Sequence, residues 1–357
     1  MMFSVIIPVF NRQELVKNAI QSVMNQDYID WECIVVDDAS TDNTFSILQD
    51  YSEKDSRIKV TQLAKNSGVS AARNGGLEIS SGEYILFLDS DDELAFNAMS
   101  TLSAILKEND VDIVVFATSQ EWIPAEGMCN RVLDRDFIRN NIFPQHINIH
   151  PQTEYFLLPY VWNKCIKRTL IIDNSIRFDE WRRIWEDNVF LVECLNRCNN
   201  MFVLPDKIHM VGNNKDIERL SRVINESLFM NYIDSYKKYR DHYGAEYNFD
   251  NDYTARRYFG VIHEHLILYY ERCSSTEFKH LVSMLICDDA LNSWVERIQS
   301  KNQIEEDIKE AFRNSDVNAL FDIYAKISKE NMHLETQIHI AKQAVSRLKR
   351  RIRKHLR

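Results

Sequence analysis

The sequence lacks long hydrophobic runs and a secretory signal. None of its apolar stretches approaches the roughly 18–20 residues that a helix needs to cross a bilayer. The first ten residues carry no basic start, and their apolar run is interrupted by Pro8 in a pattern typical of a strand. These absences predict a protein of the cytoplasm.

Cysteine is present without any pattern. The seven cysteines are scattered and odd in number, which argues against a disulfide framework. Cys194 and Cys198 are four residues apart in a predicted helix, but no second Cys/His pair flanks them at the spacing of a zinc site. We therefore expect free thiols, mostly buried.

Excess positive charge is also absent, except at one end. The formal net charge is -10, which makes nucleic acid an improbable partner. Residues 342–357, however, contain eight Lys/Arg and no Asp/Glu. An acidic body with a basic end predicts a separate anionic partner for that end, and an anionic membrane surface binding residues 347–357 is one such partner. A solvated basic terminus is the alternative.

Strand and helix patterns alternate regularly over residues 1–118. Strand patterns occur at residues 4–9, 32–36, 58–63, 84–88 and 112–117, and helical patterns at 14–26, 44–51, 69–79 and 95–107. This alternation predicts a parallel α/β sheet covered on both faces by helices. Ligands of such sheets bind beyond the carboxyl ends of the strands.

After a segment of mixed pattern, the remainder of the chain is predicted to be helical. Apolar residues recur at helical spacing over about residues 226–330, and Gly260 is the only glycine after Gly244. A strict 3-4 spacing then predicts a coiled coil over residues 324–352, which would make a homodimer. Its seam is Tyr324, Ile327, Asn331, Leu334, Ile338, Ala341, Val345, Leu348 and Ile352. A single amphipathic helix folded onto the body is the alternative.

Together these patterns predict three parts. Residues 1–222 form an α/β domain, with a nucleotide-binding half at 1–118 and an acceptor half at 119–222. Residues 223–323 form a helical domain, and residues 324–357 form a coiled-coil helix with a basic end.

Polar residues follow three of the predicted strands. The first strand ends in Pro8 and Asn11. The second strand ends in Asp37 and Asp38, and residues 89–92 follow the fourth strand. Carboxylates at the end of a buried strand are costly unless a cation or a ligand compensates their desolvation. Asp89 and Asp91 are two residues apart and suit Mn²⁺ or Mg²⁺, which prefer oxygen ligands. Taken alone, an acidic turn with a helix cap explains them as well.

Residues 66–74 add a phosphate-binding pattern between the third and fourth strands. Gly68 permits a tight turn, and the helix that follows presents its N-terminus to an anion. Arg73 can bind a diphosphate with two hydrogen bonds, although an exposed helix charge is the alternative. Asp38 can accept the imide N–H of uracil, or it caps the next helix.

These four motifs, in this order, resemble the signature of glycosyltransferase family 2. The resemblance covers residues 3–118 and continues more weakly through residues 161–164 and 185–190, which are similar to bacterial capsule, O-antigen and exopolysaccharide transferases. It implies the GT-A fold. It also implies inverting transfer of a sugar from a nucleoside diphosphate, in particular a UDP-sugar, to a glycan or lipid-linked glycan acceptor in surface polysaccharide synthesis.

The resemblance also implies roles for individual residues. Pro8, Val9 and Asn11 would line the base and ribose, Asp38 would hold uracil, and Asn66 and Arg73 would lie near the nucleotide. Asp91 would be the main protein ligand of the metal, and Asp89 would contact the ribose or a metal-bound water. Asp187 would be the general base. Phe10 stands where many relatives carry tyrosine, so a stacking contact would remain without its hydroxyl.

The reaction's requirements fit these roles. The leaving diphosphate needs positive charge, from the metal and Arg73, and the attacking hydroxyl needs a base. The charge of Glu186 beside Asp187 would raise a pKa in the pair, although an acidic helix start is the plainer explanation. Trp162 and Trp185 are candidates for stacking on sugars, or are core residues. Lys164 is a candidate contact to phosphate or acceptor.

Other functions fit less well. A nucleotidyltransferase needs a glycine-rich loop after the first strand, and a glycoside hydrolase needs two opposed carboxylates without a nucleotide site. A processive synthase would carry membrane helices and a Q-x-x-R-W sequence. A catalytically inactive scaffold subunit of a polysaccharide assembly complex is the main alternative, and the intact Asp89, Asp91 and Asp187 argue against it.

Overall fold

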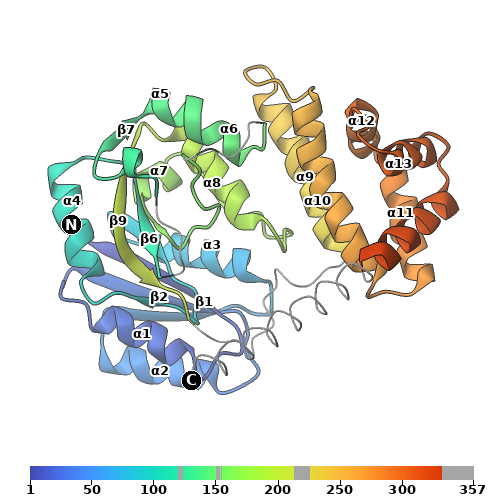
Figure 1. Ribbon diagram of the computed structural model, residues 1–357. Helices are drawn as coiled ribbons and strands as arrows, with labels where there is room; N and C mark the ends of the chain where they lie inside the picture. The colour runs from blue at the N-terminus through green and yellow to red at the C-terminus, as the bar shows by residue number, and fades with distance from the viewer. Residues whose placement is uncertain (120–123, 150–152, 154, 213–225, 332–357) are drawn as a thin grey trace, which may run out of the picture. The chain divides into compact units, whose positions relative to one another are not determined.

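The computed structural model describes residues 1–119, 124–149, 153, 155–212 and 226–331. It divides into two compact units, Met1–Val223 and Ile224–Arg357. The first unit is built on a sheet and the second from helices (Figure 1).

The first unit contains a mixed sheet of nine strands, in the order β3-β2-β1-β4-β8-β6-β9-β5, with β7 also paired to β9. The strands are β1 (Phe3–Val9), β2 (Trp31–Asp37), β3 (Ile58–Gln62), β4 (Tyr84–Phe87), β5 (Glu93–Leu94), β6 (Ile113–Thr118), β7 (Val132–Asp134), β8 (Lys164–Lys167) and β9 (Asn200–Met210). The strands expected over residues 1–118 are all present. The first four are parallel, with Val9 opposite Asp37 and Ile6 opposite Phe87.

The prediction of a wholly parallel sheet is wrong beyond β4. The strand expected at residues 112–117, observed as β6, does not pair with β4. Between them lies β8, which is antiparallel to both. This strand has four residues and is supplied by a segment far along the chain, so the local pattern of residues 1–118 contains no sign of it.

Helices cover both faces of the sheet (Figure 1). The helices of this unit are α1 (Val16–Met24), α2 (Thr44–Lys54), α3 (Val69–Ile79), α4 (Ala98–Glu108), α5 (Arg135–Phe137), α6 (Phe143–His146), α7 (Arg168–Ile172) and α8 (Glu186–Arg197), with further helical turns η1 (Glu126–Met128) and η2 (Ile138–Ile142). On one face, Ile20 of α1 and Leu102 of α4 join Val5 and Phe116 of the strands in one buried cluster.

On the other face, α3 and α8 lie over the centre of the sheet. Gly76 of α3 permits this approach, because a Cβ added there would lie 2.4 Å from a side-chain carbon of Ile6. Phe87 of β4 packs edge-on against Phe178 and Phe190, whose rings stack with centroids 4.0 Å apart. This packing fixes the start of α8 beside the carboxyl ends of β1 and β4.

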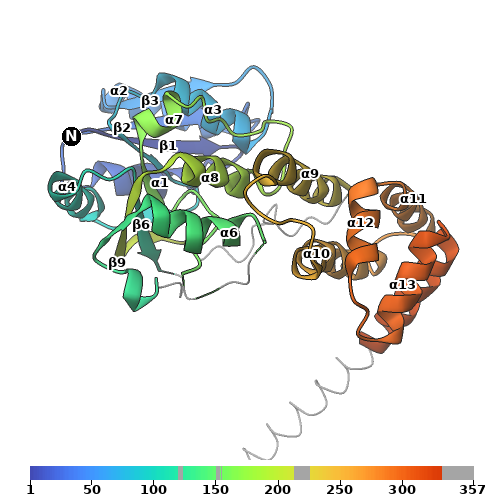
Figure 2. The same cartoon turned by 90° about the horizontal axis from the view of Figure 1, so that it is seen from above.

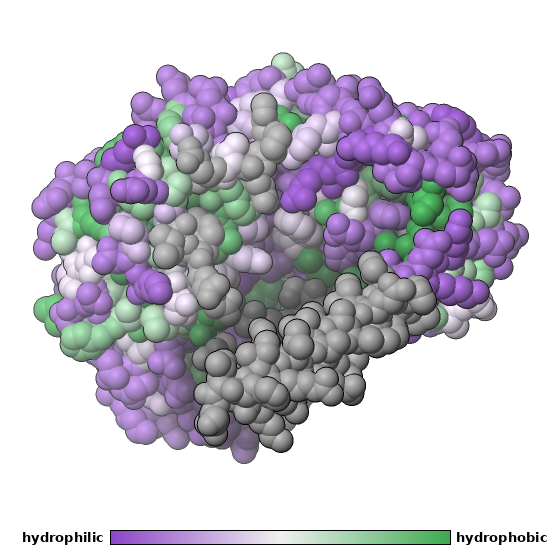
Figure 3. Space-filling view, in the orientation of Figure 1, coloured by the Kyte–Doolittle hydropathy of each residue, from purple (hydrophilic) through white to green (hydrophobic). Residues whose placement is uncertain are grey.

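The second unit is helical, as the sequence predicted. Its helices are α9 (Glu226–Tyr243), α10 (Asp252–Tyr270), α11 (Ser275–Ile286), α12 (Asp289–Arg297) and α13 (Gln303–Arg313), followed by helical residues 317–331. Both α9 and α12 pack against α10 (Figure 2). Trp294 of α12 lies between Tyr236 and Tyr258 in the core. Among the described residues, no helix is long and apolar enough to cross a membrane, and Figure 3 shows mainly hydrophilic side chains on the face in view.

The predicted coiled coil begins inside this unit. Tyr324 is buried, its hydroxyl lies 2.9 Å from Nδ1 of His263, and Ile327 is also buried. The first two seam residues therefore pack against their own unit. The seam residues from Leu334 onward, and the basic cluster, lie outside the described residues, so the dimer remains a prediction.

Candidate active site

A cavity of about 400 Å³ lies at the carboxyl ends of β1 and β2. Pro8 and Val9 from the end of β1, Asp38 from the end of β2, and Asn66 from the loop before α3 all line it. These four residues belong to the predicted nucleotide site. The cavity is where an open α/β sheet is expected to bind its ligand.

Asp38 holds the loop that closes this cavity. Its two carboxylate oxygens accept hydrogen bonds from the backbone N–H groups of Ser67 (2.6 Å) and Gly68 (2.7 Å). Gly68 has φ +95°, a conformation that favours glycine, and α3 begins at the next residue. The structure thus gives Asp38 a loop-holding role that the sequence did not predict, and its contact with uracil stays a prediction.

Asn11 links two of the strand ends. Its side-chain oxygen accepts from the N–H of Thr41 (2.8 Å), and its own N–H donates to the hydroxyl of Ser40 (2.9 Å). Asn11 has φ +50° and is not among the residues lining the cavity, whereas Phe10 and Arg12 beside it are. Asn11 therefore shapes the loop that presents its neighbours.

Sequence analysis missed three cationic residues of the cavity. Arg12, Arg182 and Arg183 line it, together with Glu180. Arg182 is almost fully buried, and its guanidinium lies 4.6 Å from the ring of Trp181. Two of these arginines belong to a segment more than a hundred residues beyond β2, and no local motif marks it. The positive charge expected of Arg73 for a diphosphate is thus available from other residues.

Arg73, which is itself buried, instead lies among three carboxylates, of which Asp187 is buried and Glu186 and Asp89 are partly exposed. Its Nη1 donates to Oδ1 of Asp187 (2.6 Å) and contacts Oε1 of Glu186 (3.3 Å), while Nη2 donates to Oδ1 of Asp89 (3.1 Å). One guanidinium therefore joins the end of β4 to the start of α8. Sequence analysis predicted all four residues for the site but not this arrangement.

The electrostatics of this group are unusual. Burial, with the charge of Asp187, raises the pKa of Glu186, and the charge of Arg73 opposes the shift. Burial and the neighbouring carboxylates raise the pKa of Asp89 to about 6, despite the same arginine. The other oxygen of Asp187 accepts from the N–H of Val161 (3.3 Å). Strongly perturbed carboxylates beside a cavity are typical of catalytic sites.

Removing this guanidinium should unfold the domain more readily. We expect Arg73→Gln to lower the free energy of unfolding by about 3–5 kcal/mol at neutral pH, because it leaves one buried and two partly exposed carboxylates without their cation. Arg177→Gln is the matched control, since Arg177 is exposed and, among the described residues, its guanidinium donates only to the adjacent carbonyl of Ile176 (3.4 Å). Urea denaturation of both variants measures the difference, and equal stabilities would contradict the structural role.

Comparison with known proteins assigns a family to the first part of the chain. Residues 4–121 match the family described as Glycosyl transferase family 2. This segment contains all four motifs of the sequence and both strand ends of the cavity. Residues 4–121 belong to glycosyltransferase family 2.

The chain is similar to curated bacterial glycosyltransferases. The chain is 30% identical over 224 residues to the poly(ribitol-phosphate) beta-N-acetylglucosaminyltransferase TarS of Staphylococcus aureus strain MW2, an alignment that covers 62% of this chain and 37% of that protein. Among the first curated relatives the chain covers between 37% and 61% of their length.

Solved structures show that the fold is GT-A, as predicted. Staphylococcus aureus TarS 1-349 in complex with UDP-GlcNAc aligns with a TM-score of 0.63 at 19% identity, over 92% of each chain. A mannosyltransferase from Pyrobaculum calidifontis in complex with GDP-Man and Mn²⁺ aligns with a TM-score of 0.50 at 16% identity, over 90% of this chain and 87% of that one.

The predicted metal ligands lie in the turn after β4. Among the described residues there is no group of three or more His, Cys, Asp or Glu side chains arranged to hold a metal. Asp89 and Asp91 are both partly exposed there, and the crowding of carboxylates that raises the pKa of Asp89 would be relieved by a cation. Two carboxylates completed by phosphate oxygens of a bound nucleotide fit Mg²⁺ or Mn²⁺.

Lys164 has three partners within the protein. It is fully buried in β8, and its side-chain nitrogen donates to the carbonyls of Leu158 (2.7 Å) and Tyr160 (2.6 Å) and to Oδ1 of Asn163 (2.7 Å). Three partners use all the donors of an ammonium group. Burial lowers its pKa to about 7. Lys164 therefore holds the loop before β8, and its contact with phosphate or acceptor stays a prediction.

The two candidate tryptophans have different surroundings. Trp162 stacks between Tyr160 (5.0 Å) and His209 (4.5 Å), and Nε2 of His209 lies 3.2 Å from a carboxylate oxygen of Asp92. Trp185 directly precedes Glu186 and has φ +67°, which is rare for a bulky residue. Such strain is often found at functional sites. Contact of either ring with a sugar remains a prediction.

Proposed function

We propose that this chain is a metal-dependent, inverting glycosyltransferase that moves a sugar from a UDP-sugar to a surface-polymer acceptor. UDP-N-acetylglucosamine is the first donor to test, because a structure of TarS contains UDP-GlcNAc. Poly(ribitol phosphate) is the first acceptor to test, because the curated name of TarS is poly(ribitol-phosphate) beta-N-acetylglucosaminyltransferase. A lipid-linked glycan is the other acceptor class that the sequence predicted.

The observation that carries the proposal is the bridge made by Arg73. It connects Asp89, beside the predicted metal ligand, to Asp187, the predicted base, through hydrogen bonds of 3.1 and 2.6 Å. A transferase needs donor binding and proton removal at neighbouring positions, so that the reacting atoms meet in one geometry.

Each part of the site has a role in this proposal. Arg12, Arg182 and Arg183 bind the diphosphate in the cavity, with Pro8 and Val9 against the nucleoside and Asp38 and Asn66 beside the base. Asp89 and Asp91 hold Mn²⁺ or Mg²⁺, which would supply positive charge to the leaving diphosphate. This assignment moves the diphosphate contact from Arg73 to the arginines of the cavity.

Proton removal falls to the carboxylates at the start of α8. Asp187 accepts the proton of the attacking hydroxyl while Arg73 fixes its carboxylate in one position. Attack from the face opposite the diphosphate inverts the anomeric carbon. Glu186 is the second candidate for the base, because its raised pKa makes it the better proton acceptor.

A panel of nucleotide sugars tests the proposal. The chain is incubated with each sugar and Mn²⁺ or Mg²⁺, with and without poly(ribitol phosphate), and release of nucleoside diphosphate is measured. Release from a UDP-sugar that increases with acceptor supports transfer. A folded chain that binds a nucleotide sugar but never releases the diphosphate would favour the inactive scaffold.

The basic end supplies a separate prediction about assembly and location. We expect deletion of residues 332–357 to convert a dimer into a monomer and to remove binding to anionic vesicles, to which each basic residue near the surface contributes about 1 kcal/mol. Light scattering gives the mass and vesicle flotation the binding. If the shortened protein has the same oligomeric state as the full chain, the coiled coil is excluded. If it floats with the vesicles to the same extent, the membrane contact is excluded.

A further inference from the structure

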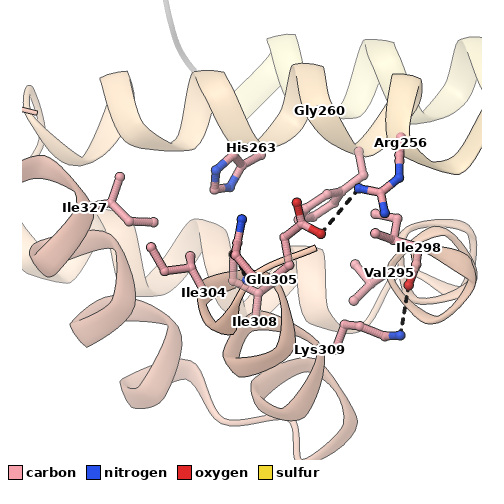
Figure 4. Close-up of a pocket in the computed structure, with 12 residues that line it drawn as sticks. Arg256, Gly260, His263, Val295, Ile298, Ile304, Glu305, Ile308, Lys309 and Ile327 are labelled. Carbon is pink, nitrogen blue, oxygen red and sulfur yellow. Dashed lines mark hydrogen bonds and ion pairs between the residues drawn. The ribbon is translucent and has the colours of Figure 1, made fainter. Parts of the chain in front are cut away.

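The helical unit contains a cavity of about 270 Å³ that is lined by residues of this unit alone (Figure 4). Its apolar lining comes from Phe259 of α10, Val295 and Ile298 at the end of α12, Ile304 and Ile308 of α13, and Ile327. All but Ile304 are buried within the unit. The lining is therefore a concave apolar surface built by several helices, the usual form of a small-molecule site.

Gly260 keeps this cavity open. It lies in the interior of the 19-residue helix α10, where glycine is less favourable than alanine by about 1 kcal/mol. Close packing does not explain it, because a Cβ added there would meet no atom within 4 Å. The missing side chain thus costs helix stability and leaves space in the cavity.

Three charged residues line the cavity, namely Arg256, Glu305 and Lys309, and two of the three are cationic. Arg256 pairs with Glu305 (3.3 Å), and also with Asp252 (3.0 Å), which is not in the lining. Lys309 donates to the carbonyl of Ile298 (2.9 Å), and in the part of the chain that the structure describes it has no carboxylate partner. Figure 4 shows its side chain extending to that carbonyl at the edge of the cavity.

Nearby carboxylates do not supply the missing partner. Hydrogen bonding from Arg313 lowers the pKa of Glu296, and the charge of Lys309 helps to lower it. Both carboxylate oxygens of Glu296, however, accept hydrogen bonds from Arg313, at 2.7 and 2.9 Å. Burial lowers the pKa of His263, the remaining titratable residue of the lining, so its ring adds no positive charge at neutral pH. One ammonium group with unused donors therefore stands beside an apolar space.

We propose that this cavity binds a single-chain anionic amphiphile, such as a fatty acid or an alkyl phosphate. The hydrocarbon chain fills the space left by Gly260, and the anionic head binds the ammonium of Lys309. A volume of 270 Å³ holds about nine groups of the size of a water molecule. A chain of about eight carbons therefore matches the cavity.

Octyl phosphate and octanoate are the probes, titrated into the full-length chain by calorimetry and thermal unfolding. Octanol has the same hydrocarbon chain without a charge, and octyltrimethylammonium has that hydrocarbon chain with a positive charge. We expect saturable binding of one anionic amphiphile per chain, weaker binding of octanol, and no binding of the cation. The two anions separate a phosphate head from a carboxylate head.

Variants locate the site. Gly260→Leu should weaken octyl phosphate binding by about 10-fold or more, because it fills the cavity, and Gly260→Ala should weaken it less. Both should raise the unfolding temperature of the free protein or leave it unchanged, since either residue favours a helix. Lys309→Gln should weaken octyl phosphate by about 2- to 5-fold and leave octanol unaffected. Lys326→Gln, an exposed charge outside the lining, is the matched control.

Three outcomes would overturn the proposal. The first is absence of saturable binding by the wild type. The second is octyl phosphate affinity that is unchanged in both Gly260 variants. The third is binding only after residues 332–357 have been removed, which would assign the cavity to that segment of the chain.

Discussion

Replacing Asp187 with asparagine should lower the rate of sugar transfer by about 10²–10⁴-fold, the usual contribution of a general base. The substitution keeps the size of the side chain and removes both its capacity to take a proton and its ion pair with Arg73. Affinity for the donor should change little, because the nucleotide cavity is lined by other residues. Steady-state release of UDP gives the rate, and calorimetry with the intact donor gives the affinity.

Glu186→Gln is the control for this prediction. Both side chains contact Nη1 of Arg73, so both variants alter the same ion-pair network. If Glu186→Gln is inactive and Asp187→Asn is active, then the base is Glu186. If both variants retain full activity, the base lies elsewhere and the proposed mechanism is wrong.

Replacing Asp91 with asparagine should reduce transfer by about 10²–10³-fold, the size expected when one electrostatic group at the leaving diphosphate is lost. We also expect donor binding by this variant to become independent of Mn²⁺ and Mg²⁺. Titration of UDP with and without each ion measures this dependence, and circular dichroism checks that the fold is intact.

Asp110→Asn is a matched control for Asp91, because Asp110 forms an exposed pair with Lys167 (2.6 Å) away from the cavity. It should transfer sugar at the wild-type rate. Undiminished wild-type transfer in excess chelator would show that no metal is needed, and the assignment of Asp89 and Asp91 would then fail.

The first half of the fold followed from local patterns. The buried run of residues 4–9 predicts a strand, and the helical spacing of residues 69–79 predicts a helix. Parallel strands joined by helices then have few possible arrangements. Local patterns could not place β8, because four residues with a buried lysine do not resemble a central strand. The position of Lys164 depends on carbonyls of a loop whose path no local pattern fixes.

The site was predictable where residues stand next to a strand end. Asp38 and Asp89 fell at the predicted edge for that reason. The partners of Arg73 were not predictable, since Asp187 lies 114 residues away and the contact exists only because α8 packs beside α3. Arg182 and Arg183 were missed for the same reason, because arginines in a loop carry no periodic signal.

The central claim is that the cavity beside β1 and β2 binds a nucleotide sugar for transfer. The most direct measurement is release of UDP from UDP-N-acetylglucosamine and related UDP-sugars by the full chain, compared with Asp187→Asn. We predict release from at least one UDP-sugar, dependent on Mn²⁺ or Mg²⁺ and lost in the variant. A folded chain that neither binds nor cleaves any nucleotide sugar, or a variant as active as the wild type, would contradict the account.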